Sequence, residues 1–189
     1  MGRHRLDTTG GHRPLTASLS FNGLRDIRGV TVLSAGYNGS SYSGETWEWN
    51  GTNWTLRSIS GPSPRSLQAM AYDAARGVSV LFGGYNGTPN GETWEWSGAL
   101  WTQRASSGPS ARVAPAMVHD SDRAVSVLFG GYNGVPTDGG DTWEWNGAIW
   151  IRAVSGPLAR DAYAMAYDSA RGVTVLFGGN GKALRGLSG

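Results

Sequence analysis

The chain has 189 residues, of which 30 are glycine and nine tryptophan, and it carries no cysteine and a formal net charge of +2. The lack of cysteine excludes disulfides, thiolate metal sites and cysteine nucleophiles. The basic excess lies in segments 1–13 and 181–189, which hold five basic residues against Asp7 alone, so the body between them has a charge of −2. A nucleic-acid-binding domain places its positive charge on the folded body, so nucleic acid is not an expected partner.

The sequence shows no segment of the kind that enters membranes. No run of about 18 apolar residues is present, so no transmembrane helix is predicted. The N-terminal stretch MGRHRLDTTGGHRP is basic but lacks the apolar segment of a secretory signal peptide. We expect no membrane partner, and the compartment stays unassigned.

An internal repeat organises the chain. Three related segments are GPSPRSLQAMAYDAARGVSVLFGGYNG from Gly61, GPSARVAPAMVHDSDRAVSVLFGGYNG from Gly108 and GPLARDAYAMAYDSARGVTVLFGGNG from Gly156, at spacings of 47 and 48 residues. A more divergent copy begins at His12. The repeat predicts three full copies at 12–59, 60–106 and 107–154 and half of a fourth at 155–180. A polar, basic tail precedes them at 1–11, and a C-terminal tail follows at 181–189.

Each full copy is predicted to form four short strands. In the copy from Gly61 they are QAMAYD (68–73), VSVLFGG (78–84), ETWEW (92–96) and a strand from Trp101 to about Arg104. The second is rich in β-branched and aromatic residues, and the Asn-Gly pair that follows favours a tight turn. No stretch has sustained helical periodicity. The sequence therefore predicts an all-β fold with a four-stranded antiparallel repeat.

These motifs carry a resemblance to a known family. The elements R-x-x-x-A-M-x-Y-D, V-x-V-L-F-G-G and D/E-T-W-E-W, with a later tryptophan, resemble the kelch motif over roughly residues 12–180. The resemblance implies a β-propeller in which each copy is one blade. The first copy departs from the motif, because Ala35 stands where a glycine is expected.

The number of copies predicts an incomplete, open propeller. The chain supplies about three and a half blades, whereas closed propellers need about four to eight. Our leading explanation is a truncated product or an excerpt of a longer propeller, and the other is a ring assembled from two or more such arcs. Open blade edges would favour self-association.

The repeated aromatic and glycine residues are predicted to be structural. Tryptophans two apart on a strand share one face, where they would fill the gap between neighbouring blades. The glycine pairs allow close backbone approach, and they are not phosphate loops because no helix follows them. The residues in these two groups are Trp47, Trp49, Trp54, Trp94, Trp96, Trp101, Trp143, Trp145, Trp150, Gly83, Gly84, Gly130, Gly131, Gly178 and Gly179.

The glutamates between the paired tryptophans, Glu48, Glu95 and Glu144, are also predicted to be structural. A catalytic pair needs two carboxylates about 5–10 Å apart at one substrate, whereas these recur once per copy. Arg57 and Arg104, on the adjacent fourth strands, are the expected partners of the first two. In the third copy the arginine comes one residue earlier, at Arg152, which leaves that pairing open.

Candidate binding residues lie on the face where the linker into the first strand meets the loop between strands two and three. One group is arginine: Arg13, Arg65, Arg112 and Arg160. The arginines would gather at a channel mouth and attract anions, and similar positions in kelch domains meet acidic peptides. The alternative is that each arginine pairs with a carboxylate such as Asp73 or Asp168.

No catalytic constellation or cofactor site stands out, so we predict that the chain is not an enzyme. A galactose-oxidase-like central domain also has kelch-type blades, but that resemblance implies a copper site with a tyrosine cross-linked to cysteine, which a chain without cysteine cannot build. The leading hypothesis is a binding module for a protein or peptide. The alternatives are a carbohydrate-binding or enzyme-associated propeller that uses loop tyrosines, and a fragment without independent activity. The loop tyrosines are Tyr37, Tyr85 and Tyr132.

Overall fold

The fold is all-β in the residues that the structure, a computed structural model, describes: 24–25, 28–133, 140–153 and 156–181. These residues form fourteen strands and no helix, arranged as four separate antiparallel sheets. The all-β prediction is therefore confirmed. Arg13 and the two predicted tails fall outside the described residues, except for Gly181.

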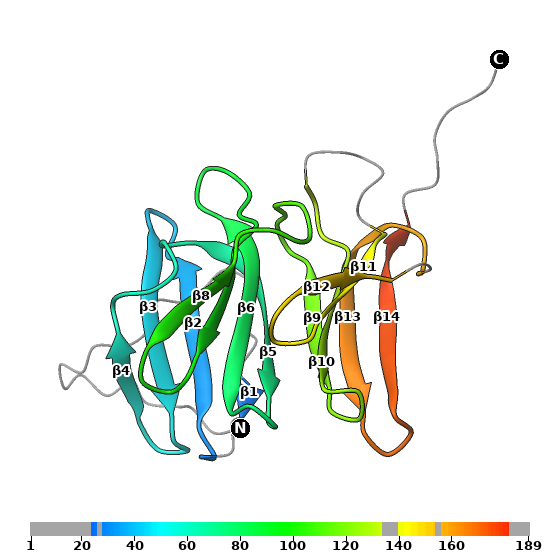
Figure 1. Cartoon of the computed structure of the whole chain (residues 1–189). Coiled ribbons are helices and arrows are strands. Elements are labelled where there is room, and N and C mark those ends of the chain that lie inside the picture. Colours follow the sequence, from blue (N-terminus) through cyan, green and yellow to red (C-terminus); the bar gives the residue numbers. More distant parts are fainter. Residues whose placement is uncertain (1–23, 26–27, 134–139, 154–155, 182–189) are drawn as a thin grey trace, which may run out of the picture.

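The strands follow one another in the order of the sequence within each sheet (Figure 1). Sheet 1 comprises β1 (Leu24–Arg25), β2 (Thr31–Tyr37), β3 (Tyr42–Trp49) and β4 (Trp54–Ser58). Sheet 2 comprises β5 (Ser66–Asp73), β6 (Val78–Tyr85), β7 (Thr93–Trp96) and β8 (Trp101–Ala105). Sheet 3 comprises β9 (Ala116–Asp120), β10 (Val125–Phe129), β11 (Thr142–Trp145) and β12 (Trp150–Arg152). Sheet 4 comprises β13 (Arg160–Asp168) and β14 (Val173–Gly181).

The strands form where the sequence predicts them, and in the second strands of the two inner sheets, β6 and β10, apolar residues on both faces are covered. In β6, Val80, Leu81 and Phe82 are all fully buried. A strand covered on both faces reads as a continuous apolar run rather than an alternating one. The four strands predicted from the copy at Gly61 overlap β5, β6, β7 and β8.

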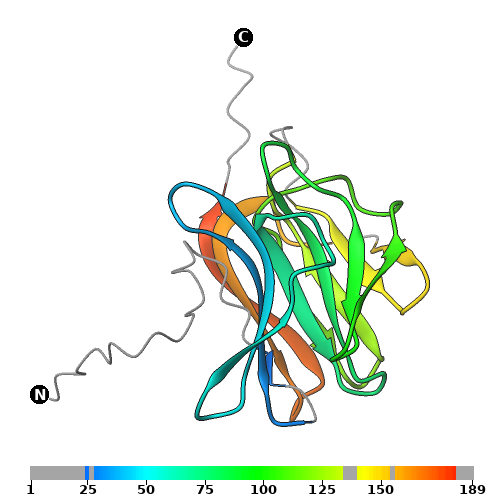
Figure 2. The ribbon, with the colours of Figure 1, turned by 90° about the vertical axis from the view of Figure 1, so that its left-hand side faces the viewer.

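The sheets lie side by side in chain order, with sheet 1 and sheet 4 at the two ends of the row (Figure 1). The first strands of successive sheets contact one another, β5 against β9 and β9 against β13. Side chains on the first strands also link the sheets. The amide of Gln68 donates to the carbonyl of Ser34 at 2.7 Å, and the hydroxyl of Tyr163 donates to the carbonyl of Phe129 at 2.6 Å. The turned view of Figure 2 shows the strong twist of the individual sheets.

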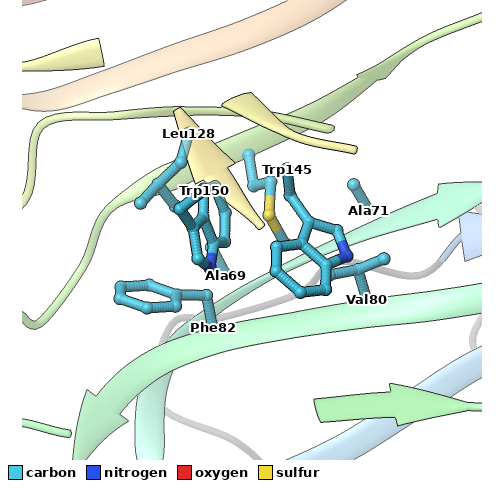
Figure 3. Packing of buried hydrophobic residues seen from close by; sticks show 8 residues of the cluster. Ala69, Ala71, Val80, Phe82, Leu128, Trp145 and Trp150 are labelled. Carbon is cyan, nitrogen blue, oxygen red and sulfur yellow. The ribbon is translucent and has the colours of Figure 1, made fainter. Parts of the chain in front are cut away.

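The hydrophobic core lies between the sheets. Between sheets 2 and 3, Trp145 and Trp150 pack against Val80 and Phe82 (Figure 3). The ring of Trp150 meets that of Phe82 edge-on, with centroids 5.3 Å apart. Between sheets 1 and 2, Val32 packs with a corresponding cluster that includes Trp96 and Trp101. Each gap between neighbouring sheets buries large aromatic side chains, which contribute about 2–3 kcal/mol apiece by area.

Three of the paired glycines, Gly83, Gly84 and Gly131, lie where backbones come too close for a side chain, whereas a Cβ on Gly178 would meet no atom within 4 Å. A Cβ on Gly83 would lie 2.8 Å from the carbonyl oxygen of Arg112, and one on Gly84 would lie 2.9 Å from that of Ser66. Both residues have positive φ, as do Gly130, Gly131, Gly178 and Gly179. Ala35 takes the place of the first glycine in sheet 1 and has a φ of 65°. The divergent copy therefore keeps the backbone conformation without the residue that favours it.

Replacing Ala124 by glycine is expected to stabilise the fold. Ala124 has a φ of 53° in an exposed turn whose equivalent positions in the other sheets are Gly29, Gly77 and Gly172. Relief of the left-handed conformation outweighs the added chain entropy, so the free energy of unfolding should rise by about 0.5–1 kcal/mol in urea denaturation. The reverse change, Gly77→Ala, should lower it although nothing lies within 4 Å of the added Cβ. Equal stability of all three proteins would contradict the prediction.

Candidate functional site

Arg65 is buried and does not project to the surface. Its side chain has no solvent exposure and lies within sheet 2, just before β5. It donates hydrogen bonds to the carbonyls of Ser63 and Gly83 at 2.9 and 3.0 Å, and forms an ion pair with Glu92 at 2.6 Å. Burial alone would raise the pKa of Glu92, but bonds from Arg65 and Trp94 and the charge of Arg65 lower it overall.

Arg112 repeats this arrangement in sheet 3. Its guanidinium donates to both carboxylate oxygens of Asp141, at 2.6 and 3.0 Å, and to the carbonyl of Gly130 at 2.9 Å. Burial would raise the pKa of Asp141, yet the hydrogen bonds from Arg112 and Trp143 and the Arg112 charge outweigh it, so the pKa lies below its ordinary value of 3.8. Each arginine thus ties the start of a sheet to its second and third strands.

These contacts leave Arg65 and Arg112 unable to meet a ligand in this conformation. Neither exposes its guanidinium to solvent, so the structure favours internal pairing over an arginine-lined channel mouth at these positions. Arg160 in sheet 4 is partly exposed and donates to the carbonyl of Gly178 at 3.2 Å, and Arg13 lies outside the described residues.

The carboxylates proposed from sequence as arginine partners, Asp73 and Asp168, pair with other residues. Asp73 binds Arg76 at 2.7 Å and Asp168 binds Arg171 at 2.6 Å, each across one tight turn. The same D-x-x-R pair recurs as Asp120–Arg123. This pairing was not predicted from the sequence, although an aspartate and an arginine recur three residues apart in three copies.

Two of the glutamates between the paired tryptophans, Glu48 and Glu95, bind the next sheet. The indole N–H of Trp96 donates to Glu48 at 3.2 Å, and that of Trp145 donates to Glu95 at 3.1 Å. Equivalent bonds at 2.8 Å run from Trp101 to Thr46 and from Trp150 to Thr93. In each bond the donor lies on one sheet and the acceptor on the sheet before it.

The glutamates are neutralised by arginines of their own sheet. Glu95 is 2% exposed and accepts from Arg76 at 2.5 Å and Arg104 at 2.8 Å. Glu48 pairs with Arg57 at 3.1 Å, so both pairings expected with the fourth strands are present. The partner of Glu144, which the sequence left open, is Arg123 and not an arginine of the fourth strand; the two side chains are 2.6 Å apart. Because arginines neutralise these carboxylates, their role is structural, and this pairing makes them unsuited to acid–base chemistry.

The remaining tryptophans bind within their own sheets or lie at the end of the row. Trp47, Trp94 and Trp143 each donate to the acidic residue two positions earlier, at 2.9, 3.0 and 2.6 Å. Trp49 and Trp54 are half-buried on sheet 1, with ring centroids 5.6 Å apart.

The loop face, defined as the end of the sheets that carries the β2–β3 and β6–β7 loops and linker 59–65, holds an aromatic cluster. The rings of Tyr37 and Tyr42 lie 5.0 Å apart, and Tyr85 of sheet 2 meets Tyr42 edge-on at 6.2 Å. The linker reaches the same face, because Asn86 of the β6–β7 loop donates to the Ser63 hydroxyl at 3.2 Å. In Figure 1 these loops rise above the upper ends of the strands.

A groove with a volume of about 490 Å³ lies beside this cluster, between residues 41–45 and 59–64. Tyr42, Pro62 and Pro64 supply apolar surface, and Ile59 borders it with 79% of its surface exposed. Glu45 and Ser63 supply polar groups. The wall of the groove therefore combines apolar and polar groups in similar measure.

Of the loop tyrosines predicted to bind, the structure brings Tyr37 and Tyr85 together and leaves Tyr132 apart. Tyr132 is 52% exposed in the segment after β10, where it bridges to Val113. Tyr42 and Ile59 were missed, because neither position recurs as the same residue in the other copies and the sequence alone did not show that linker 59–65 meets the start of β3. Partial burial, followed by the neighbouring Tyr85 and Tyr37, raises the pKa of Tyr42 above its ordinary value.

The described residues contain no group of three or more histidine, aspartate or glutamate side chains placed to hold a metal ion. Within the same ranges there is also no helix long and apolar enough to cross a membrane. Neither a protein-family model nor a curated protein matches this sequence.

Proposed function

We propose that the chain is a kelch-type β-propeller segment that acts as a non-catalytic binding module for a peptide. Three observations support the propeller assignment: three four-stranded meander sheets and a two-stranded sheet in sequence order, first strands in mutual contact, and tryptophans between the sheets. The resemblance of the repeated motifs to kelch sequences supports the family. The three complete sheets are three blades, and β13–β14 is the inner half of a fourth.

The groove beside Tyr42 is the observation that carries the binding assignment. It combines a tyrosine, two prolines and an exposed isoleucine with a carboxylate and hydroxyls, and loops on a rigid scaffold form its walls. An extended peptide with an apolar side chain suits such a surface, since Tyr and Ile anchor it and the polar groups fix its direction. Because Arg65 and Arg112 are buried, the proposed ligand has no need to be acidic.

A peptide selection tests this proposal. We expect a displayed library of random peptides to yield a common motif on the wild-type chain, and Tyr42→Ala and Ile59→Ser to weaken the selected peptide by about tenfold or more. Leu158→Ser is the matched control, because Leu158 is 79% exposed like Ile59 but lies away from the groove. Binding that is absent, or that survives both groove substitutions in folded protein, would refute the proposal.

A carbohydrate is the second candidate ligand, and the Tyr37–Tyr42–Tyr85 cluster is the observation that favours it. Aromatic side chains on an exposed face can stack on sugar rings. A glycan array with the wild type and Tyr85→Ala separates the two candidates. Reproducible sugar binding that Tyr85→Ala abolishes would support the carbohydrate over the peptide.

A further inference from the structure

The outer face of sheet 4 is an exposed apolar surface. Phe177 is 80% exposed, and Val173 and Val175 are 42% and 39% exposed. Ala164 and Ala166 on the paired strand are exposed as well. Contiguous apolar side chains on an otherwise polar protein mark an interaction surface.

The repeat identifies what covers this surface elsewhere in the molecule. The equivalents of Phe177 and Val175 in sheet 2 are Phe82 and Val80, and both are fully buried. They are covered by Trp145 and Trp150 of the following sheet (Figure 3). The alanines show the same contrast, since Ala69 and Ala71 have no exposure where Ala164 and Ala166 are open.

The opposite end of the row presents a matching tryptophan pair. Glu48 accepts a bond from sheet 2, so the next residue, Trp49, points away from sheet 2. The Trp49 and Trp54 rings lie 5.6 Å apart at 38°, compared with 5.5 Å and 42° for Trp145 and Trp150. The pair therefore already has the geometry of its buried counterparts.

The tryptophan pair of sheet 1 also lacks the contacts that its counterparts make. Trp49 and Trp54 are half-buried, whereas Trp145 and Trp150 are 1% and 9% exposed. No described residue accepts a hydrogen bond from the indole N–H of Trp49 or Trp54, although the corresponding groups of the other sheets all bond to a preceding sheet.

We propose that this chain associates head to tail, with the tryptophan pair of sheet 1 in one copy packed on the Phe177 face of sheet 4 in a second copy. Trp54 would meet Phe177 as Trp150 meets Phe82, and Trp49 would cover Val175 and Ala166. The contact joins two different surfaces, so it leaves one of each open and builds either a closed ring or a growing chain.

The contact is weaker than the internal interfaces for an identifiable reason. The indole groups of Trp145 and Trp150 bond to Glu95 and Thr93 on β7, and sheet 4 has no strand beyond β14 among the described residues. The indole N–H groups of the docked pair would face water at the rim. Association should therefore depend on protein concentration in the accessible range.

Sedimentation velocity over a range of concentrations tests the proposal. The wild type should grow in mass with concentration, and Phe177→Lys and Trp54→Lys should each weaken association by about tenfold or more. Phe177 is 80% exposed, so its substitution should leave the fold intact. Leu158→Lys is the matched control, because Leu158 is 79% exposed but lies in the linker before β13, and it should associate as the wild type does.

A mixture of the two single-face variants gives the decisive result. Each variant retains the surface that the other has lost, so an equimolar mixture should form a dimer that grows no further. A mixture that stays monomeric, or a wild type that is monomeric throughout, would overturn the proposal. Two further results would also overturn it. If Trp54→Lys alone still associates, sheet 4 packs on sheet 4 of another copy. If each variant associates without the other, the copies pair through the edge of β14. Circular dichroism and the melting temperature check that Trp54→Lys is folded.

Discussion

Replacing Arg112 by methionine is expected to lower the free energy of unfolding by about 3–5 kcal/mol. Methionine fills much of the same space, but it leaves the carboxylate of Asp141, which is 10% exposed, without its counter-charge. The carbonyl of Gly130 also loses its donor within sheet 3. Urea denaturation followed by tryptophan fluorescence measures the change.

Arg171→Met is the control for this effect. Arg171 reaches Asp168 over the same 2.6 Å that separates Arg112 from Asp141, but it is 66% exposed. Exposed pairs contribute at most about 1 kcal/mol, so this substitution should change stability little. Equal losses in the two variants would mean that burial does not decide the energy of these pairs.

The pH dependence of the free energy of unfolding at acid pH is a second test of the Arg112–Asp141 pair. Because the pKa of Asp141 is below its ordinary value of 3.8 in the folded chain, its stabilising contribution is complete above that value. The contribution is lost as the pH falls through the lower, folded pKa. Arg112→Met removes the main cause of the lowered pKa, so the variant should lose less stability than the wild type between about pH 5 and pH 2.

The repeat in the sequence was sufficient to predict the strands, their order and their grouping. Residues such as Val80, Leu81 and Phe82 form strands whatever covers them, because their composition and the flanking turns are local signals. The glycine pairs are also recognisable in each copy, but the neighbour that requires Gly83 is the carbonyl of Arg112 in the next copy, which a single copy does not contain.

The roles of the arginines could not be decided in the same way. Arg65 and Arg112 each precede a first strand, which is equally compatible with a surface role and with a buried ion pair. The choice depends on where Glu92 and Asp141 fall after the chain turns twice, and no local pattern fixes that distance. A nearer candidate such as Asp73 is taken by Arg76 across a tight turn.

The residues that line the groove differ from the repeated residues in how they are placed. A residue that recurs in every copy occupies an equivalent position in every sheet, and here such residues bind neighbouring sheets, as Glu48 and Trp96 do. Tyr42 and Ile59 occur in one copy only and come together because linker 59–65 passes the start of β3. Recognition is therefore expected at residues that break the repeat rather than at those that define it.

Replacing Trp145 by alanine should destabilise the chain by about 3–5 kcal/mol, whereas Trp49→Ala should cost much less. The two residues occupy the same place in their sheets, but Trp145 is 1% exposed between sheets 2 and 3 and Trp49 is half-buried at the end of the row. Removing Trp145 opens a cavity against Val80 and Ala71, while Glu95 keeps both of its arginines and stays neutralised. Thermal and urea unfolding of monomeric protein at low concentration compare the pair. A similar loss for both would show that the tryptophan stabilises its own sheet, and that packing between sheets is not the main force holding the row together.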